Sequence, residues 1–208
     1  MERKFHTLEQ SKELIAPIYE EVVDCIRNSF ADFITFKNVF DEKAGFVEFQ
    51  KRTKACIIHD LIKGKITNSF STNPTVTIGT FNKVFGIVLN DDLFLRFKKM
   101  DKDYKVSSLK TKQHKKFMNQ HQIEGFPETP TFLFAGYIPN ATWTDLDGIY
   151  LACWNGDILE WYDEAGNYSY EQSNFDFQTN ADTDLFEVKG DKLTLKEGLK
   201  KKKETGTN

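Results

Sequence analysis

The 208-residue sequence has few cysteines and no long apolar run. Its three cysteines, Cys25, Cys56 and Cys153, are far apart and lack the paired spacing of a zinc site or a disulfide framework. We therefore expect reduced thiols buried in the core. No stretch has the length and apolar character of a signal peptide or a membrane span, so we predict a cytoplasmic protein without a membrane partner.

Several motifs that identify enzymes are also missing. The chain contains no glycine-rich phosphate loop, dinucleotide fingerprint, His-Glu-x-x-His zinc motif or Gly-x-Ser-x-Gly nucleophile elbow. No acidic pair has a metal-binding pattern, and no cysteine has a histidine beside it as a base. We therefore predict no metal and no cofactor, and the sequence leaves open whether the protein is an enzyme.

Charge is plentiful but unevenly spread. The net charge of −3 argues against nucleic-acid binding by overall charge alone. Residues 96–116 nevertheless contain nine lysines and arginines, whereas residues 160–187 contain none. Such asymmetry indicates either two surfaces of the protein that complement each other or a basic face for an acidic partner.

Hairpin signals dominate the centre and second half of the chain. The apolar runs 84–89 and 93–97 are joined by residues 90–92, of types (Asn, Asp, Asp) that tolerate the positive φ of a tight turn. Asn155-Gly156, the strongest short hairpin signal, joins two further alternating runs. Further strands are expected at residues 75–78 and 131–138.

Helical signals lie mainly in the first third. Thr7 and Gln10 spell a capping box, and Pro17 should kink the helix or start a new one. Residues 33–40 are aromatic and look buried, but they fit no regular element. A second helix is expected at about residues 46–63, with the apolar stripe Phe46, Phe49, Thr53, Cys56, Ile57 and Leu61.

Together these signals predict an α+β fold with N-terminal helices packed on a mainly antiparallel sheet of five or more strands. We expect residues 1–165 to form a single domain. Residues 166–199 should be a polar, acidic C-terminal extension with a possible small hairpin, and residues 200–208 a flexible lysine-rich tail.

The strand at 93–97 suggests a functional surface. Because side chains alternate along a strand, residues 93, 95 and 97 should face the core, while Arg96 and Lys98 share the outer face about 7 Å apart. Two cations held by a rigid sheet suit an anion. The alternative is a solvated sheet edge that is kept soluble by its charges.

His59 is the candidate base. On a helix it shares a polar face with Arg52 and Lys63, so it is either a titrating base beside cations or a surface histidine near the helix end. Metal-free phosphodiester cleavage needs a base and cations that hold the phosphate. The candidate phosphate-binding residues are Arg52, Arg96, Lys98 and Lys99, with Thr111, the expected N-cap of a short basic helix at 112–122, and Gln113.

Four aromatic residues in the second half leave another possibility open. They would line a small-molecule pocket under the sheet or simply belong to the core: Trp143, Tyr150, Trp154 and Trp161.

Several short motifs lie between Lys51 and Trp161: Ile58-His59-Asp60, Leu95-Arg96-Phe97-Lys98-Lys99-Met100-Asp101, and Thr111, Phe117, Gln120 and Gly136-Tyr137. In these motifs the chain resembles a family of bacterial proteins associated with prophages and other mobile elements. It departs from the family pattern at Met100, where leucine is usual, and at Ile123, where a Leu-Pro pair tends to occur. The resemblance implies a setting of phage conflict but no particular reaction.

Two functions follow as hypotheses. The first is a protein that acts by protein–protein interaction in a phage defence, counter-defence or toxin–antitoxin-like system. The alternative is a protein that binds RNA or DNA, or a metal-independent ribonuclease-like effector, which uses its basic sheet face and His59. The sequence predicts no oligomeric state.

Overall fold

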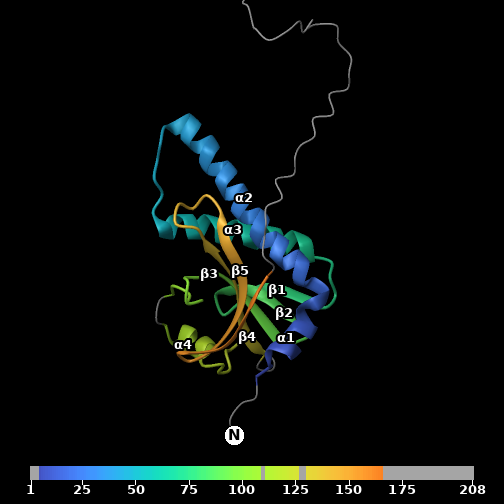
Figure 1. The fold of residues 1–208 in the computed structure, drawn as a ribbon. Coiled ribbons are helices and arrows are strands. Elements are labelled where there is room, and N and C mark those ends of the chain that lie inside the picture. Colours follow the sequence, from blue (N-terminus) through green and yellow to red (C-terminus); the bar gives the residue numbers. More distant parts are fainter. Residues whose placement is uncertain (1–4, 109–110, 127–129, 166–208) are drawn as a thin grey trace, which may run out of the picture. The chain divides into compact units, whose positions relative to one another are not determined.

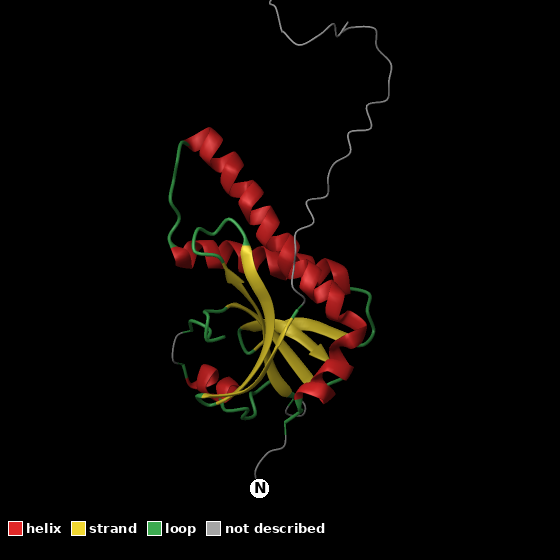
Figure 2. Ribbon diagram, viewed as in Figure 1, coloured by secondary structure: helices red, strands yellow, loops and turns green. Residues whose placement is uncertain are grey.

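The computed structural model describes residues 5–108, 111–126 and 130–165, which form a helical layer, a sheet and a second layer on the opposite face (Figures 1 and 2). The predicted α+β architecture is confirmed. The expected C-terminal extension and the lysine-rich tail lie outside the described residues. The elements are α1 (Leu8–Ile15), the 3₁₀ helix η1 (Ala16–Ile18), α2 (Tyr19–Ala44), α3 (Lys51–Phe70), β1 (Val76–Phe81), β2 (Val84–Leu89), β3 (Leu93–Lys99), α4 (Lys112–Met118), β4 (Thr131–Pro139), β5 (Leu146–Asn155) and β6 (Ile158–Glu164).

The start of the chain folds as its sequence indicates. The Thr7 hydroxyl accepts from the Gln10 N–H, and the Gln10 side chain accepts from the Thr7 N–H, which completes the capping box. Pro17 lies in η1 between α1 and α2, so the predicted interruption is confirmed. After it the apolar residues at helical spacing are buried: Ile18, Val22, Ile26 and Phe30.

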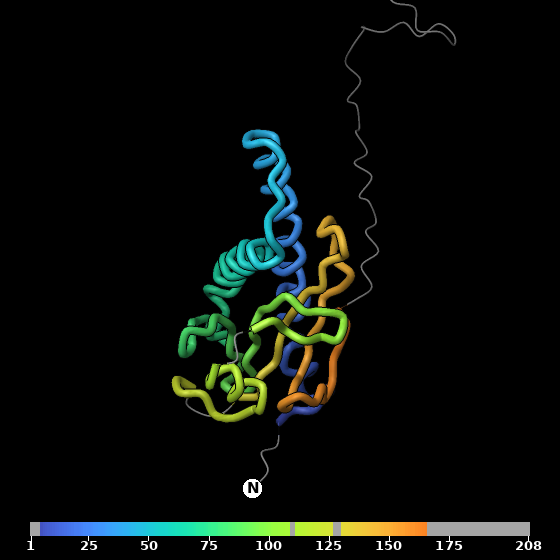
Figure 3. The backbone as a smooth tube through the Cα atoms, turned by 90° about the vertical axis from the view of Figure 1, so that its left-hand side faces the viewer, coloured from blue at the N-terminus to red at the C-terminus, as the bar shows by residue number. Residues whose placement is uncertain are grey.

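The interpretation of residues 33–40 as an irregular buried segment is wrong. They continue α2, which ends only at Ala44, before Gly45 with φ +79°. No residue of α2 beyond Phe33 is fully buried. Figures 1 and 3 show why: the C-terminal half of α2 extends past the sheet. The aromatic side chains there contact one another rather than the core.

The second long helix is shifted relative to the prediction. It begins at Lys51 rather than Phe46 and passes through Gly64 to Phe70. Its buried stripe is Ile58, Ile62, Ile66 and Phe70, whereas Thr53 and Cys56 are exposed. This series of large apolar residues at i, i+4 spacing therefore decides which face of α3 packs on α2 and the sheet.

The sheet has the order β1-β2-β3-β4-β5-β6, and consecutive strands are antiparallel except for the parallel pair β3–β4. Both predicted hairpins are confirmed. The β2–β3 turn has positive φ at Asn90 and Asp91, and the β5–β6 turn has positive φ at Gly156. Parallel strands need a crossover, and here it runs over one face of the sheet and contains α4.

The two faces of the sheet each carry a hydrophobic core. Leu93, Leu95 and Phe97 face the core under α1, α2 and α3, as predicted. The opposite face was expected to be open, and this is wrong: Phe94 on that face is only 1% exposed. The crossover supplies a second set of apolar residues that covers it, Met100, Phe117, Ile123 and Phe126 among them.

The four aromatic residues of the suggested pocket do not line one cavity. Tyr150 and Trp154 belong to the second core, whereas Trp143 and Trp161 pack with the first. Tyr150 and Trp154 point to one face of β5, whereas Trp161 on β6 pairs with Cys153, whose side chain points to the other face. The expectation of core thiols holds for Cys25 and Cys153, but Cys56 is exposed on α3.

Candidate functional site: a basic cluster at the end of the β2–β3 ladder

The pairing between β2 and β3 ends halfway along both strands. It includes Leu89 with Leu93, Val88 with Phe94 and Ile87 with Leu95, and no pair beyond. The rest of β2 pairs only with β1, and the rest of β3 pairs only with β4. Gly86 lies at this divergence, where a β-carbon would come within 2.4 Å of the Leu95 carbonyl oxygen. The edge of β3 from Arg96 to Lys99 is therefore free of β2.

Five basic side chains from three elements gather around this part of β3. We call His59 and Lys63 of α3, Arg96 and Lys98 of β3, and His114 of α4 the basic cluster. Their charges act on one another: both histidines lie within electrostatic range of Arg96 and Lys98. Lys63 is exposed and the other four are half-buried.

His59 is anchored to the strand pair through an aromatic ring. Its imidazole meets Phe85 edge to face at 6.3 Å between centroids, and Phe85 lies 6.2 Å from Phe97. The Lys63 ammonium lies 5.6 Å from the centre of the same Phe85 ring. Phe85 therefore contacts two members of the cluster beside β3: the His59 ring packs against it edge to face, and the Lys63 ammonium is attracted to the face of the ring.

The environment of His59 favours its neutral form. Burial lowers the pKa of His59, and the charges of Lys98, Arg96 and Lys63 lower it further, while Asp60 acts in the opposite direction. At neutral pH a histidine with a lowered pKa is unprotonated and can accept a proton. This is the protonation state that the predicted base requires.

Arg96 is a cation placed among aromatic rings. Its guanidinium carbon lies 5.4 Å from the Phe117 ring centre and 5.9 Å from that of Phe134. Burial lowers the pKa of Arg96 to about 10, so the side chain keeps its charge at neutral pH. Burial and the charge of Arg96 lower the pKa of Lys98, and the thiol of Cys56 opposes this.

His114 is a member that reasoning from sequence missed. It lies one turn before Phe117 on α4, so the docking of Phe117 under Arg96 brings it to the cluster. Burial lowers the pKa of His114, as do Arg96 and Lys98. Its Nδ1 atom is buried and has no hydrogen-bond partner among the residues that the structure describes. The sequence held a usable signal, because His114 is three residues from both the Thr111 cap and the buried Phe117.

The described part of the chain places little negative charge near the cluster. Its ion pairs are Lys12–Asp163, Arg27–Asp24, Lys37–Asp41 and Lys65–Asp32, and none includes a member of the cluster. Among these residues, the one carboxylate that acts on His59 is Asp60, which is exposed. Cations that form no ion pair with a described carboxylate suit an anionic ligand.

The other predicted residues lie around the cluster in different roles. Arg52 is exposed on the face of α3 that carries His59, about 10 Å before it by helical rise. The Thr111 hydroxyl caps α4 by accepting from the His114 N–H at 3.1 Å. The Gln113 amide donates to the Asn82 carbonyl and so ties α4 to the β1–β2 turn. Lys99 points to the opposite face of β3 and approaches Trp143 instead.

Comparison of the chain with protein-family models, curated proteins and solved structures gave no match. In the part of the chain that the structure describes, no group of three or more His, Cys, Asp or Glu side chains is placed to hold a metal ion. None of the helices in this same part has the length and apolar character that a bilayer span requires.

Proposed function

We propose that the protein binds single-stranded nucleic acid through the basic cluster, with the phosphate groups held by Arg96 and Lys98. The observation that carries this is the convergence of two histidines, an arginine and two lysines at the part of β3 that does not pair with β2, where no carboxylate of the described residues forms an ion pair with them. Arg52 extends the basic surface along α3. Phosphate contacts supply most of the affinity of sequence-independent binding.

The two histidines suit the cluster for cleavage of RNA. His59, neutral at pH 7, would take the proton from a 2′-hydroxyl as O2′ attacks the phosphorus. His114 would give a proton to O5′ as the P–O5′ bond breaks, which leaves a 2′,3′-cyclic phosphate and a 5′-hydroxyl. The negative charge of a bound phosphate raises the pKa of a neighbouring histidine, so one of the two can be protonated in the complex. Arg96 and Lys98 would stabilise the charge that develops on the phosphoryl oxygens.

Binding is tested with a fluorescently labelled single strand that has a 5′-hydroxyl, by anisotropy at several salt concentrations. We expect Lys98→Met to weaken binding about tenfold, since a charged hydrogen bond contributes about 1.5 kcal/mol. The slope of log K against log salt should fall by about 0.7 for the lost contact. Lys99→Met is the matched control, because the adjacent lysine points away from the cluster. Equal effects of the two variants would contradict the proposal.

Cleavage is tested with labelled RNA in the presence of a chelator. We expect a 2′,3′-cyclic phosphate product and no cleavage of the DNA analogue. The variants His59→Asn and His114→Asn should lose cleavage but keep their affinity for RNA. Binding without any cleavage would leave the nucleic-acid site standing and refute the catalytic role of the histidines.

A second candidate function, protein binding, is favoured by a different surface. We call Phe36, Val39, Phe46 and Val47, with the partly buried Phe40 and Phe49, the aromatic tip. Phe36 and Val39 are each 44% exposed and Phe46 is 82% exposed, an uncommon degree for residues so close together. The rings of Phe36 and Phe49 stack at 6.4 Å, and the Lys37 ammonium lies 5.0 Å from the Phe46 ring centre.

We propose that the aromatic tip binds an apolar surface of a protein partner, in the setting of phage conflict that the sequence motifs imply. Expression in a bacterial host, with growth and copurifying proteins scored together, tests it. Phe36→Ser combined with Phe46→Ser should abolish a stoichiometric copurifying partner. The control Ile158→Ser removes a side chain that is 65% exposed on β6 and should change nothing. A partner that still copurifies with the doubly substituted protein would show that the aromatic tip is not its binding surface.

A further inference from the structure

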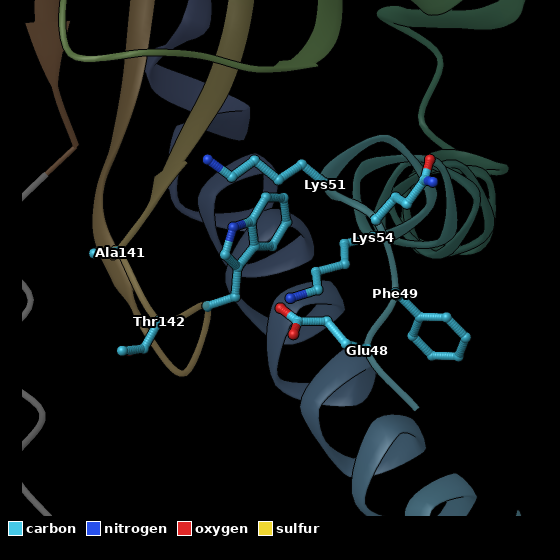
Figure 4. A pocket seen from close by; sticks show the side chains of 8 residues that line it. Glu48, Phe49, Lys51, Lys54, Ala141 and Thr142 are labelled. Atoms are coloured by element: carbon cyan, nitrogen blue, oxygen red, sulfur yellow. The ribbon is translucent and has the colours of Figure 1, made fainter. Parts of the chain in front are cut away.

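A cavity lies between the N-terminal end of α3 and the loop that joins β4 to β5. Its volume is about 610 Å³, and it is lined on one side by residues 48–51 and Lys54 and on the other by residues 141–143. Figure 4 shows Lys51 and Lys54 reaching from α3 toward the loop that holds Ala141 and Thr142, whereas Phe49 points away. The size falls within the range of about 300–1,000 Å³ typical of small-molecule sites.

The loop side of the cavity is built around a strained tryptophan. Trp143 has φ +60°, a conformation that is rare for a bulky residue, and it is only 7% exposed. The side chain of Asn140 holds this turn: it accepts from the N–H of Thr144 at 3.0 Å and from the hydroxyl of Thr142 at 3.2 Å. Strain of this kind persists where the surroundings enforce it, and it is enriched at ligand sites.

Lysines surround the tryptophan. The Lys54 ammonium lies 5.4 Å and the Lys99 ammonium 5.9 Å from the centre of the Trp143 ring. Burial lowers the pKa of Lys99, and Lys51 lowers it further, while Asp101 acts in the opposite direction. In the described part of the chain, none of these three lysines forms an ion pair.

The start of α3 adds to the positive potential. Lys51 is the first residue of this 20-residue helix, and the side chain of Gln50 at the N-cap makes no capping hydrogen bond. The first N–H groups of a helix favour negative charge. One opposing charge, that of Glu48, lines the cavity, and Figure 4 shows its carboxylate turned toward Lys54.

We propose that this cavity binds a phosphate group with two negative charges, a phosphate monoester or a polyphosphate, between Lys51 and Lys54, with Lys99 nearby at the Trp143 ring that lines the cavity. The Trp143 ring positions two of the ammonium groups, and a dianion would relieve the repulsion among all three. The site is separate from the basic cluster, because Lys98 and Lys99 point to opposite faces of β3. The ligand is either a free phosphorylated small molecule or the 5′-phosphate at the end of a nucleic acid, and only the second source rests on the proposed function.

The direct test is titration of the full chain with pyrophosphate and with ADP, followed by calorimetry and by tryptophan fluorescence. We expect saturable binding, weakened at least fivefold by Lys54→Met and by Lys99→Met. Glu48→Gln should tighten binding two- to fivefold, because it removes the opposing charge. Lys65→Met is the matched control on α3, since Lys65 pairs with Asp32 at 2.7 Å, and should leave the affinity unchanged. Absence of saturable binding at millimolar pyrophosphate, or equal affinities of Lys54→Met and Lys65→Met, would overturn the proposal.

Two further measurements distinguish the two possible ligands, and distinguish this cavity from the basic cluster. If the ligand is a nucleic-acid end, an oligonucleotide with a 5′-phosphate binds more tightly than the same strand with a 5′-hydroxyl, and Lys99→Met removes the difference. If it is a small molecule, pyrophosphate and ADP bind and the two strands do not differ. Lys98→Met should weaken binding of the 5′-hydroxyl strand and leave binding of pyrophosphate unchanged. The two proposed sites can therefore be refuted independently of each other.

Discussion

Gln120 links the second layer to the sheet, and its replacement by methionine should strongly destabilise the protein. The side chain is 2% exposed. Its amide donates to the carbonyls of Phe132 at 2.8 Å and Trp154 at 2.9 Å, and its oxygen accepts from the Phe132 N–H at 2.9 Å. Methionine has a similar length and fills the same space, but it cannot form these three hydrogen bonds with the backbone.

A buried polar group that loses its hydrogen bond costs about 1–3 kcal/mol, so the three together predict a loss of about 3–9 kcal/mol in the free energy of unfolding. Urea denaturation followed by far-UV circular dichroism measures it. Gln122→Met is the matched control, because Gln122 is exposed and its replacement should cost less than about 0.5 kcal/mol. A loss below about 1 kcal/mol in Gln120→Met would refute the reasoning, and with it the role of this side chain in positioning α4.

Two other substitutions test the electrostatics and the helix. Lys98→Met should raise the pKa of both His59 and His114, because the charge of Lys98 lowers both; Lys99→Met should move neither. The pH titration of the imidazole Cε1–H signals by NMR measures this, and unmoved midpoints in Lys98→Met would contradict the assignment of the cluster. Since a histidine with a lowered pKa in the folded state destabilises the fold as pH falls below about 6.5, Lys98→Met should also lessen the loss of stability in acid. Gly64→Ala should stabilise the protein by about 0.5–1 kcal/mol, because a β-carbon at this position inside α3 would meet nothing within 4 Å. A lower midpoint of thermal unfolding would show that this glycine has another role.

Local signals predicted much of the fold. The turns at Asn90 and Gly156 could be predicted because only a few residue types tolerate positive φ. The helix caps at Thr7 and Thr111 could be predicted because a side-chain hydroxyl accepts a hydrogen bond from a free N–H group at the start of a helix. The course of α2 beyond Phe33 could not be predicted in this way, because the usual sequence signal of a helix is an apolar stripe that faces a core. Its aromatic residues instead face solvent and each other.

The basic cluster was predictable only in part, because only some of its geometry follows from local sequence. Alternation along β3 placed Arg96 and Lys98 on one face, which depends only on strand geometry. Their surroundings depend on the β3–β4 crossover, which covers that face and brings His114 to it. Contacts between residues so far apart in sequence have no local signature. The lysines at the Trp143 cavity were missed for the same cause, since Lys51 and Lys99 come within electrostatic range of each other only in the folded chain.

The exposed thiol of Cys56 makes the basic cluster open to chemical footprinting without an engineered label. It lies one turn from His59 on α3 and within electrostatic range of Lys98, while the other two cysteines are buried. A maleimide should therefore react at a single position. Because the reagent and a bound strand would compete for the same space, the rate of alkylation becomes a direct measure of how often the cluster is occupied.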